Sequence, residues 1–140
     1  MNASKGSTQT WEYANMPAIG LNHINLRAPD PLLKELRDFY CALVGLAEGE
    51  RPPFKSFGYW LYAGDSPVLH LSAAGDDEAC ASGVKTTVDH VAYSCTDFDA
   101  MRARLDASGL PYAVSDVPLR RQRQLFFEDP AGNGVELNFS

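Results

Sequence analysis

The second half of this chain repeats the first. Residues 21–26, LNHINL, align with residues 88–93, VDHVAY, so that His23 meets His90 at an offset of 90 − 23 = 67 residues. Residues 68–71, VLHL, align with residues 134–137, GVEL, where His70 meets Glu136 at an offset of 136 − 70 = 66. Self-similarity over such a distance indicates one supersecondary unit packed against its duplicate. The sequence therefore predicts two modules of the same architecture.

Each copy carries a helix signal after its first strand. In the first copy we expect Asp30 as N-cap, Pro31 at the first helical position and Gly45 as the stop, with apolar residues between them at three- and four-residue spacing. In the second copy, Thr96 begins a Thr-x-x-Asp variant of the capping box, and Gly109 follows the apolar stripe. Each module is therefore expected to run from strand to helix to further strands.

Segments rich in aromatic and aliphatic residues follow each helix and are interrupted by turn residues. We expect one hairpin from residues 59–63 and 68–72 and another from residues 124–128 and 135–139. A further strand is expected near residues 48–52 in the first copy and near residues 112–117 in the second. The pattern predicts an α+β fold of two tandem βαβββ modules.

The expected boundaries follow from where this pattern begins and ends. The stretch around residues 75–83 is rich in acidic and small residues, which is typical of a linker. We expect an N-terminal extension, a first module, a linker and a second module, at residues 1–17, 18–75, 76–86 and 87–140.

Four side chains on the expected strands are able to bind a metal ion: His23, His70, His90 and Glu136. Strand side chains alternate between two faces, and each of the four opposes an aliphatic set that helices could cover. The four include all 3 histidines of the chain, at repeat-equivalent positions of the same parity. Imidazole and carboxylate ligands suit zinc, nickel, iron or manganese. The sequence therefore predicts a divalent-metal site.

Charge and composition exclude several classes of partner. The 140 residues suit one compact domain, and the net charge of −6 argues against a nucleic-acid partner. No apolar run is long enough for a membrane span, and no signal-peptide pattern begins the chain. The 3 cysteines lack CxxC spacing, so we expect reduced thiols. We expect a cytoplasmic protein without a membrane partner.

Over residues 19–140 the chain resembles the vicinal-oxygen-chelate superfamily of glyoxalases, extradiol dioxygenases and bleomycin resistance proteins. The resemblance is carried by GLNHINL, by DFY ahead of LVGL, by VDHVA and by FEDPAGNGVEL, at residues 20–26, 38–46, 88–92 and 127–137. It implies curved mixed sheets around a metal-centred cavity. It also implies a homodimer whose sites combine the first module of one subunit with the second module of the other.

The resemblance also implies roles for single residues. His23, His90 and Glu136 match recurrent metal ligands, whereas His70 stands where glyoxalase I has a glutamate. Whether His70 is a ligand or an acid/base is left open, because imidazole titrates near neutrality. Arg27 resembles the arginine that holds a carboxylate of glutathione.

The implied function is a glyoxalase I-like lyase or isomerase acting on a small molecule. The metal would act as Lewis acid, and Glu136 or His70 would move the substrate proton. The expected substrate-binding residues are Arg27, Asn25, Trp60, Tyr62 and Arg123. Two alternatives remain: an extradiol-type Fe(II) dioxygenase, since two histidines and one carboxylate form a facial triad, and a non-catalytic drug-binding resistance protein. A fosfomycin thiol transferase ranks lower, because its potassium loop and phosphonate-binding residues have no clear match.

Overall fold

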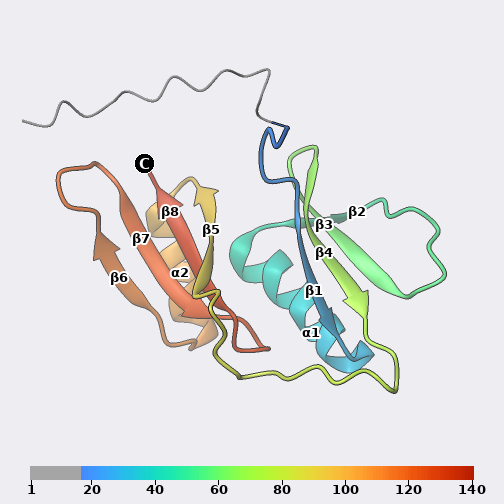
Figure 1. The fold of residues 1–140 in the computed structure, drawn as a ribbon. Coiled ribbons are helices and arrows are strands. Elements are labelled where there is room, and N and C mark those ends of the chain that lie inside the picture. The colour runs from blue at the N-terminus through green and yellow to red at the C-terminus, as the bar shows by residue number, and fades with distance from the viewer. Residues whose placement is uncertain (1–16) are drawn as a thin grey trace, which may run out of the picture.

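The computed structural model describes residues 17–140, so almost all of the expected N-terminal extension lies outside the described residues. The chain forms two βαβββ modules (Figure 1). This confirms the predicted α+β fold. The first module contains β1 (Ile24–Ala28), α1 (Asp30–Phe39), η2 (Tyr40–Val44), β2 (Ala47–Gly49), β3 (Gly58–Ala63) and β4 (Ser66–Ala73). The second contains β5 (His90–Cys95), α2 (Phe98–Ser108), β6 (Ala113–Asp116), β7 (Arg123–Glu128) and β8 (Gly134–Phe139).

The two modules build mixed sheets of the same topology. Their strand orders are β1-β4-β3-β2 and β5-β8-β7-β6, with the first strand of each module parallel to the last and the other pairs antiparallel. The crossover through α1 or α2 makes the parallel pair possible, because parallel neighbours need a long connection. β1 begins directly after His23, and β5 begins at His90. Both are edge strands of their sheets.

The helix ends differ in detail from the prediction. The N-cap of α1 is Pro29 and not Asp30, and the helix continues into the π-helical turn η2. Gly45 ends this turn at a φ of 88°, a left-handed conformation that glycine adopts without strain. The N-cap of α2 is Asp97 and not Thr96, because the Asp97 carboxylate accepts the Ala100 N–H. Gly109 ends α2 as predicted.

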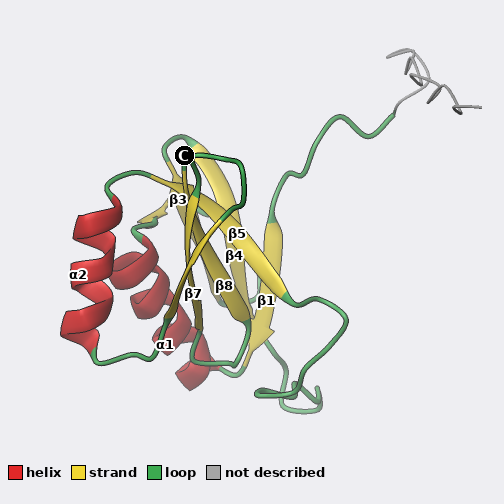
Figure 2. Cartoon of the chain, turned by 90° about the vertical axis from the view of Figure 1, so that its left-hand side faces the viewer, coloured by secondary structure: helices red, strands yellow, loops and turns green. Residues whose placement is uncertain are grey.

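Both helices lie on the same side of the strands (Figure 2). Their apolar stripes cover one face of each sheet, where the leucines of helix and strand are almost completely buried. These leucines are Leu33, Leu36, Leu61, Leu69, Leu71, Leu105, Leu125 and Leu137. Removing this apolar surface from water is the main stabilising contribution to the fold.

The modules share one core through the end of α1 and through η2. The ring of Phe39 lies 5.8 Å from that of Phe127, and Tyr40 lies 6.1 Å from Tyr93. The Tyr40 hydroxyl donates a buried hydrogen bond of 2.7 Å to Asp129, in the turn before β8. Burial, reinforced by the Asp129 charge, raises the pKa of Tyr40. Asp129 also accepts the backbone N–H groups of Ala131 and Asn133, so one carboxylate holds both the turn and the module contact.

No helix within residues 17–140 has the length and hydropathy needed to span a membrane. The sheet faces opposite the helices carry the polar side chains, and they form the candidate site.

Candidate metal-binding site

On the first module, three rings form a stack on the face away from the helices. His70 on β4 pairs with Trp60 on β3, and their rings lie 4.1 Å apart with an angle of 8° between the planes. His23, directly before β1, stacks on His70 at 3.8 Å and 17°. His70 is buried, and its Nε2 atom has no hydrogen-bond partner among the described residues. Burial lowers the pKa of His70, and the charges of His23 and Arg51 act in the same direction.

The stacking limits how His23 and His70 could share a metal ion. An imidazole binds a metal in its ring plane, through a nitrogen lone pair. Two rings stacked at 3.8 Å and only 17° from parallel cannot both point a lone pair at one nearby ion. Both could be ligands only after one ring rotates. In this arrangement at most one of the two rings could be a ligand of a given ion.

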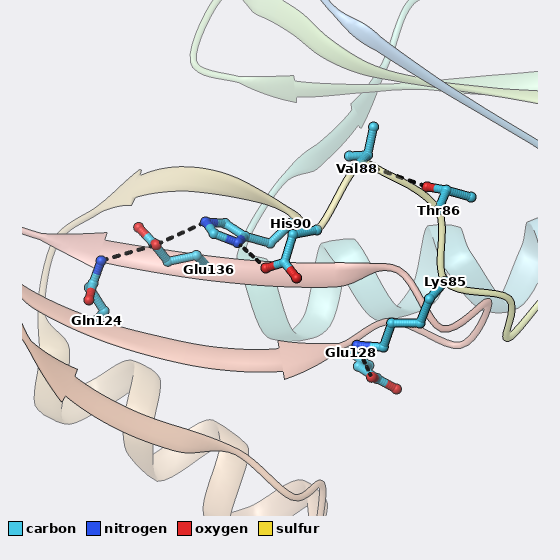
Figure 3. A network of polar contacts seen from close by, with 8 residues as sticks. Lys85, Thr86, Val88, His90, Gln124, Glu128 and Glu136 are labelled. Carbon is cyan, nitrogen blue, oxygen red and sulfur yellow. Dashed lines mark hydrogen bonds and ion pairs between the residues drawn. The ribbon is translucent and has the colours of Figure 1, made fainter.

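On the second module, His90 and Glu136 meet on neighbouring strands. Nε2 of His90 lies 3.3 Å from Oε1 of Glu136, while Nδ1 of His90 lies 2.7 Å from Asp89 (Figure 3). This contact with His90 lowers the pKa of Asp89. A carboxylate on one ring nitrogen fixes the orientation in which the other nitrogen faces a metal. The ring of Phe126 packs edge-on against His90 at 5.5 Å.

Glu136 is a carboxylate in a place where an isolated charge is unfavourable. Its exposed fraction is only 5%. Gln124 donates to Oε1 at 3.1 Å and Asn138 donates to Oε2 at 3.2 Å, and both donors are neutral amides. A buried charge needs a compensating charge as well as hydrogen bonds. A cation held between His90 and Glu136 would supply that compensation, so the residues present fit a divalent metal.

Sequence reasoning missed Gln124 and Asn138. Strand parity could have found them, because Asn138 follows Glu136 by two residues on β8 and pairs with Gln124 on β7.

The four predicted ligands lie in two separate pairs, one on each module. Within residues 17–140, no three His, Cys, Asp or Glu side chains are grouped closely enough to hold a metal ion. A cavity of about 630 Å³ lies between the two edge strands, lined by His23 and Val68 on the first module and by Val91, Tyr93 and Met101 on the second. His70, His90 and Glu136 do not line it. Within the described chain, the four predicted ligands therefore do not meet at one point.

Of the five expected substrate-binding residues, Asn25 and Trp60 both pair with His70 on the open face of the first module, and Tyr62 follows Trp60 by two residues on β3. Arg27 shares that face, but its Nε donates to Glu78 at 2.5 Å and its Nη1 donates to Ser72 at 3.4 Å. The Ser72 hydroxyl in turn donates to Asn25 at 2.8 Å. The guanidinium of Arg27 is thus already neutralised by a carboxylate of the chain.

The structure does not bring Arg123 to Glu136. Its guanidinium lies 3.7 Å from the centre of the Phe98 ring and 3.5 Å from Asp116. Arg123 pairs with Phe139, whose ring packs against Phe98 on the helix side, so Arg123 faces away from its neighbour Gln124. Arg123 is the first residue of β7 and follows a polar loop, so the sequence did not indicate which face of the sheet its side chain would occupy.

Residues 20–137 match the family model described as the Glyoxalase/Bleomycin resistance protein/Dioxygenase superfamily. Similar solved structures include a lactoylglutathione lyase from Agrobacterium tumefaciens, 21% identical with a TM-score of 0.61, covering 89% of this chain and 96% of that one. The fosfomycin resistance protein FosX from Listeria monocytogenes, solved with Mn(II) and sulfate, is 19% identical with a TM-score of 0.63, covering 88% and 93%.

A glyoxalase/dioxygenase from Nostoc punctiforme is 22% identical with a TM-score of 0.64, covering 93% of this chain and 95% of that one. No curated protein is significantly similar to the chain. At these identities the structural similarity establishes the fold.

Proposed function

Because the chain belongs to the glyoxalase/bleomycin resistance protein/dioxygenase superfamily, we propose that it is a divalent-metal-dependent lyase or isomerase that resembles glyoxalase I in its chemistry. The observation that carries this proposal is the pairing of His90 with the buried Glu136 at 3.3 Å. The pair combines a neutral nitrogen ligand with an anionic oxygen ligand. The other polar partners of Glu136 are neutral amides, so within the chain only a protonated His90 would compensate the carboxylate charge, whereas a bound cation would do so with His90 neutral.

The complete site is proposed to form in a homodimer. His23 of one subunit would join His90 and Glu136 of the other, which gives three protein ligands and leaves positions open for substrate. Two features support this arrangement: β1 and β5 are edge strands with unpaired backbone groups, and each chain separates its ligands into two pairs. Closure of two open sheet faces on each other would also enclose the small-molecule substrate.

A divalent ion bound there would polarise a substrate carbonyl oxygen. The residues of the chain then have separate tasks. Glu136 or His70 takes the proton from the carbon next to that carbonyl, and Gln124 and Asn138 hold the Glu136 carboxylate in place through the amide hydrogen bonds described above. His70 suits a proton-transfer role because its Nε2 has no partner among the described residues and its pKa is lowered by burial. It is therefore neutral near pH 7 and has a lone pair on one ring nitrogen, although the lowered pKa makes it a weaker base than a free imidazole.

The donor set also favours a second candidate function. His23, His90 and Glu136 are two histidines and one carboxylate, which is the facial triad of Fe(II) dioxygenases. In that case His70 would be an acid or base next to a bound catechol. The two functions differ in their requirement for oxygen.

The test is the metal content of the full chain, purified without chelator and measured by plasma mass spectrometry. We expect near-stoichiometric nickel, zinc or manganese, with loss of that metal in His90→Ala and Glu136→Ala and retention in the control Arg123→Ala. Stoichiometric iron with oxygen-dependent turnover of catechols would replace the lyase by the dioxygenase. Failure to bind any supplied metal would overturn both and leave the drug-binding protein.

A further inference from the structure

We propose that Arg51 is the residue that recognises an anionic group of the substrate, and that the substrate carries a carboxylate or phosphonate on a flat apolar group. The inference rests on the proposed function to the extent that it takes the open face of the first module as the substrate site. The sequence analysis did not single out Arg51, which lies in the loop between β2 and β3.

The two arginines of this face differ in their charge balance. Arg27 is paired with Glu78 at 2.5 Å, so a substrate anion could bind Arg27 only by displacing that carboxylate. Among residues 17–140, no carboxylate lies within ion-pair distance of Arg51. Its polar partners are the carbonyl oxygen of Ser56 at 2.8 Å and the Ser56 hydroxyl at 3.4 Å. A guanidinium stays charged at any physiological pH, so Arg51 is a cation available to a ligand.

Arg51 has donor capacity that the chain does not use. Its Nε is buried and has no hydrogen-bond partner among the described residues. A guanidinium has five N–H donors, which match the two oxygens of a carboxylate or a phosphonate. The buried Nε is out of reach of a ligand, but an oxyanion would supply the counter-charge that the chain does not, and it could accept from the N–H groups of Nη1 and Nη2 that Ser56 leaves unused.

The fold holds this cation on the open face of β3. A Cβ at Gly58 would clash first with the Leu71 carbonyl oxygen at 2.2 Å and would also lie 3.0 Å from Nη2 of Arg51, so the guanidinium packs directly against this glycine. Gly58 and Trp60 are two residues apart on the same strand and therefore share a face. The cation is thus fixed on the face that carries the His70 stack.

Aromatic rings connect Arg51 to His70. The guanidinium lies 4.9 Å from the ring centre of Phe54, which is 53% exposed, and Phe54 lies 6.2 Å from Trp60. Trp60 in turn stacks on His70 at 4.1 Å. A flat apolar group would stack on these rings with its anion at Arg51 and its other end toward His70. Aromatic surface beside a fixed cation is suited to an aryl or enyl oxyanion.

The contact between Arg51 and Ser56 also stabilises the loop before β3, so loss of binding alone would not prove recognition. Selectivity separates the two roles. A loop defect weakens anionic and neutral ligands alike, whereas loss of a recognising cation weakens only the anion.

The experiment measures the dissociation constants of phenylacetate, phenylphosphonate and the neutral phenylacetamide by titration calorimetry on the full chain. We expect the wild type to bind at least one anion about tenfold more tightly than the amide, the ratio that one charge-assisted hydrogen bond supports. Arg51→Met should reduce that ratio to about one with amide binding unchanged, and Arg51→Lys should restore part of it. Arg37→Met, which removes an arginine that is paired with Asp38 and stacks on Tyr59, is the matched control and should keep the ratio. The tighter anion identifies carboxylate or phosphonate.

Equal losses of anion and amide binding in Arg51→Met would overturn the proposal, as would an unchanged ratio or the absence of binding by every probe. Metal content of the same preparations separates this outcome from that of the proposed function. Selectivity without metal would reject the enzyme and keep Arg51 as the recognising residue. Metal without selectivity would reject Arg51 alone.

Discussion

Gln124 and Arg123 are adjacent in β7 but face opposite sides of the sheet. Gln124 donates to Glu136, whereas Arg123 packs on Phe98 and pairs with Asp116. Gln124 therefore contacts the candidate metal site, whereas Arg123 contacts α2 on the other face of the sheet. A hydrogen bond to a metal-binding carboxylate fixes its orientation and raises its affinity for the ion.

Gln124→Ala is expected to weaken metal binding roughly 10–100-fold, the cost typical of removing a group that orients a ligand. Competition with a chromophoric chelator measures the affinity. Arg123→Ala is the control and should bind metal as the wild type does. If the two variants bind metal equally well, Gln124 has no part in orienting Glu136.

At the scale of whole elements, β8 combines two functions in alternating residues. Leu137 is fully buried against the helices, and Glu136 and Asn138 lie on the opposite face. The same alternation predicted from sequence which residues of β1, β4, β5 and β8 share a face with the histidines. It succeeded because the period of a strand is fixed by backbone geometry.

The helix ends were harder to predict. The switch from α1 to the π-helical turn at Tyr40 accompanies the packing of that ring on Tyr93 and Asp129, contacts with residues more than fifty positions away. Helix propensity carries no information about such contacts. The predicted cap positions were also wrong by one residue. The N-cap of α1 is Pro29, which makes no side-chain hydrogen bond, and at the start of α2 the adjacent Thr96 and Asp97 were both candidates.

Leu137→Ala is expected to lower the free energy of unfolding by about 2–5 kcal/mol, because it removes buried methyl groups and leaves a cavity. Glu136→Gln should abolish metal binding while the stability of the metal-free protein stays equal or rises, because an uncompensated buried charge is lost. Urea unfolding in the presence of chelator, at one protein concentration, compares the two variants. A large loss of stability in Glu136→Gln would show that the carboxylate is needed for folding.

At the scale of the whole molecule, the repeat alone did not predict that the four side chains lie in two separate pairs, although the family resemblance implied sites shared between modules of different subunits. Repeat-equivalent positions indicated that all four side chains belong to one kind of site. They did not indicate whether the halves meet within a chain or between chains, because both arrangements use the same strands and parities. The relative placement of the modules depends on the core around Phe39, Tyr40 and Phe127, whose contacts cross the repeat.

Mixing two inactive variants tests the shared site. In a dimer of His23→Ala with His90→Ala, one site carries both substitutions and the other carries neither. Refolding the two variants together should therefore restore about one quarter of the wild-type metal sites, given random pairing in a twofold dimer. Metal content and activity of the mixture report the restoration, and each variant refolded alone is the control. A mixture no better than its components would show that each site lies within one chain.

The buried hydrogen bond from Tyr40 of the first module to Asp129 of the second has no equivalent from the second module to the first. At the offsets of the repeat, Tyr40 corresponds to Ala107 (40 + 67 = 107) and Asp129 corresponds to Ala63 (129 − 66 = 63), so the reciprocal pair has no counterpart. The two copies have thus lost their interchangeability. Replacing either module by a copy of the other would therefore remove this buried contact between them.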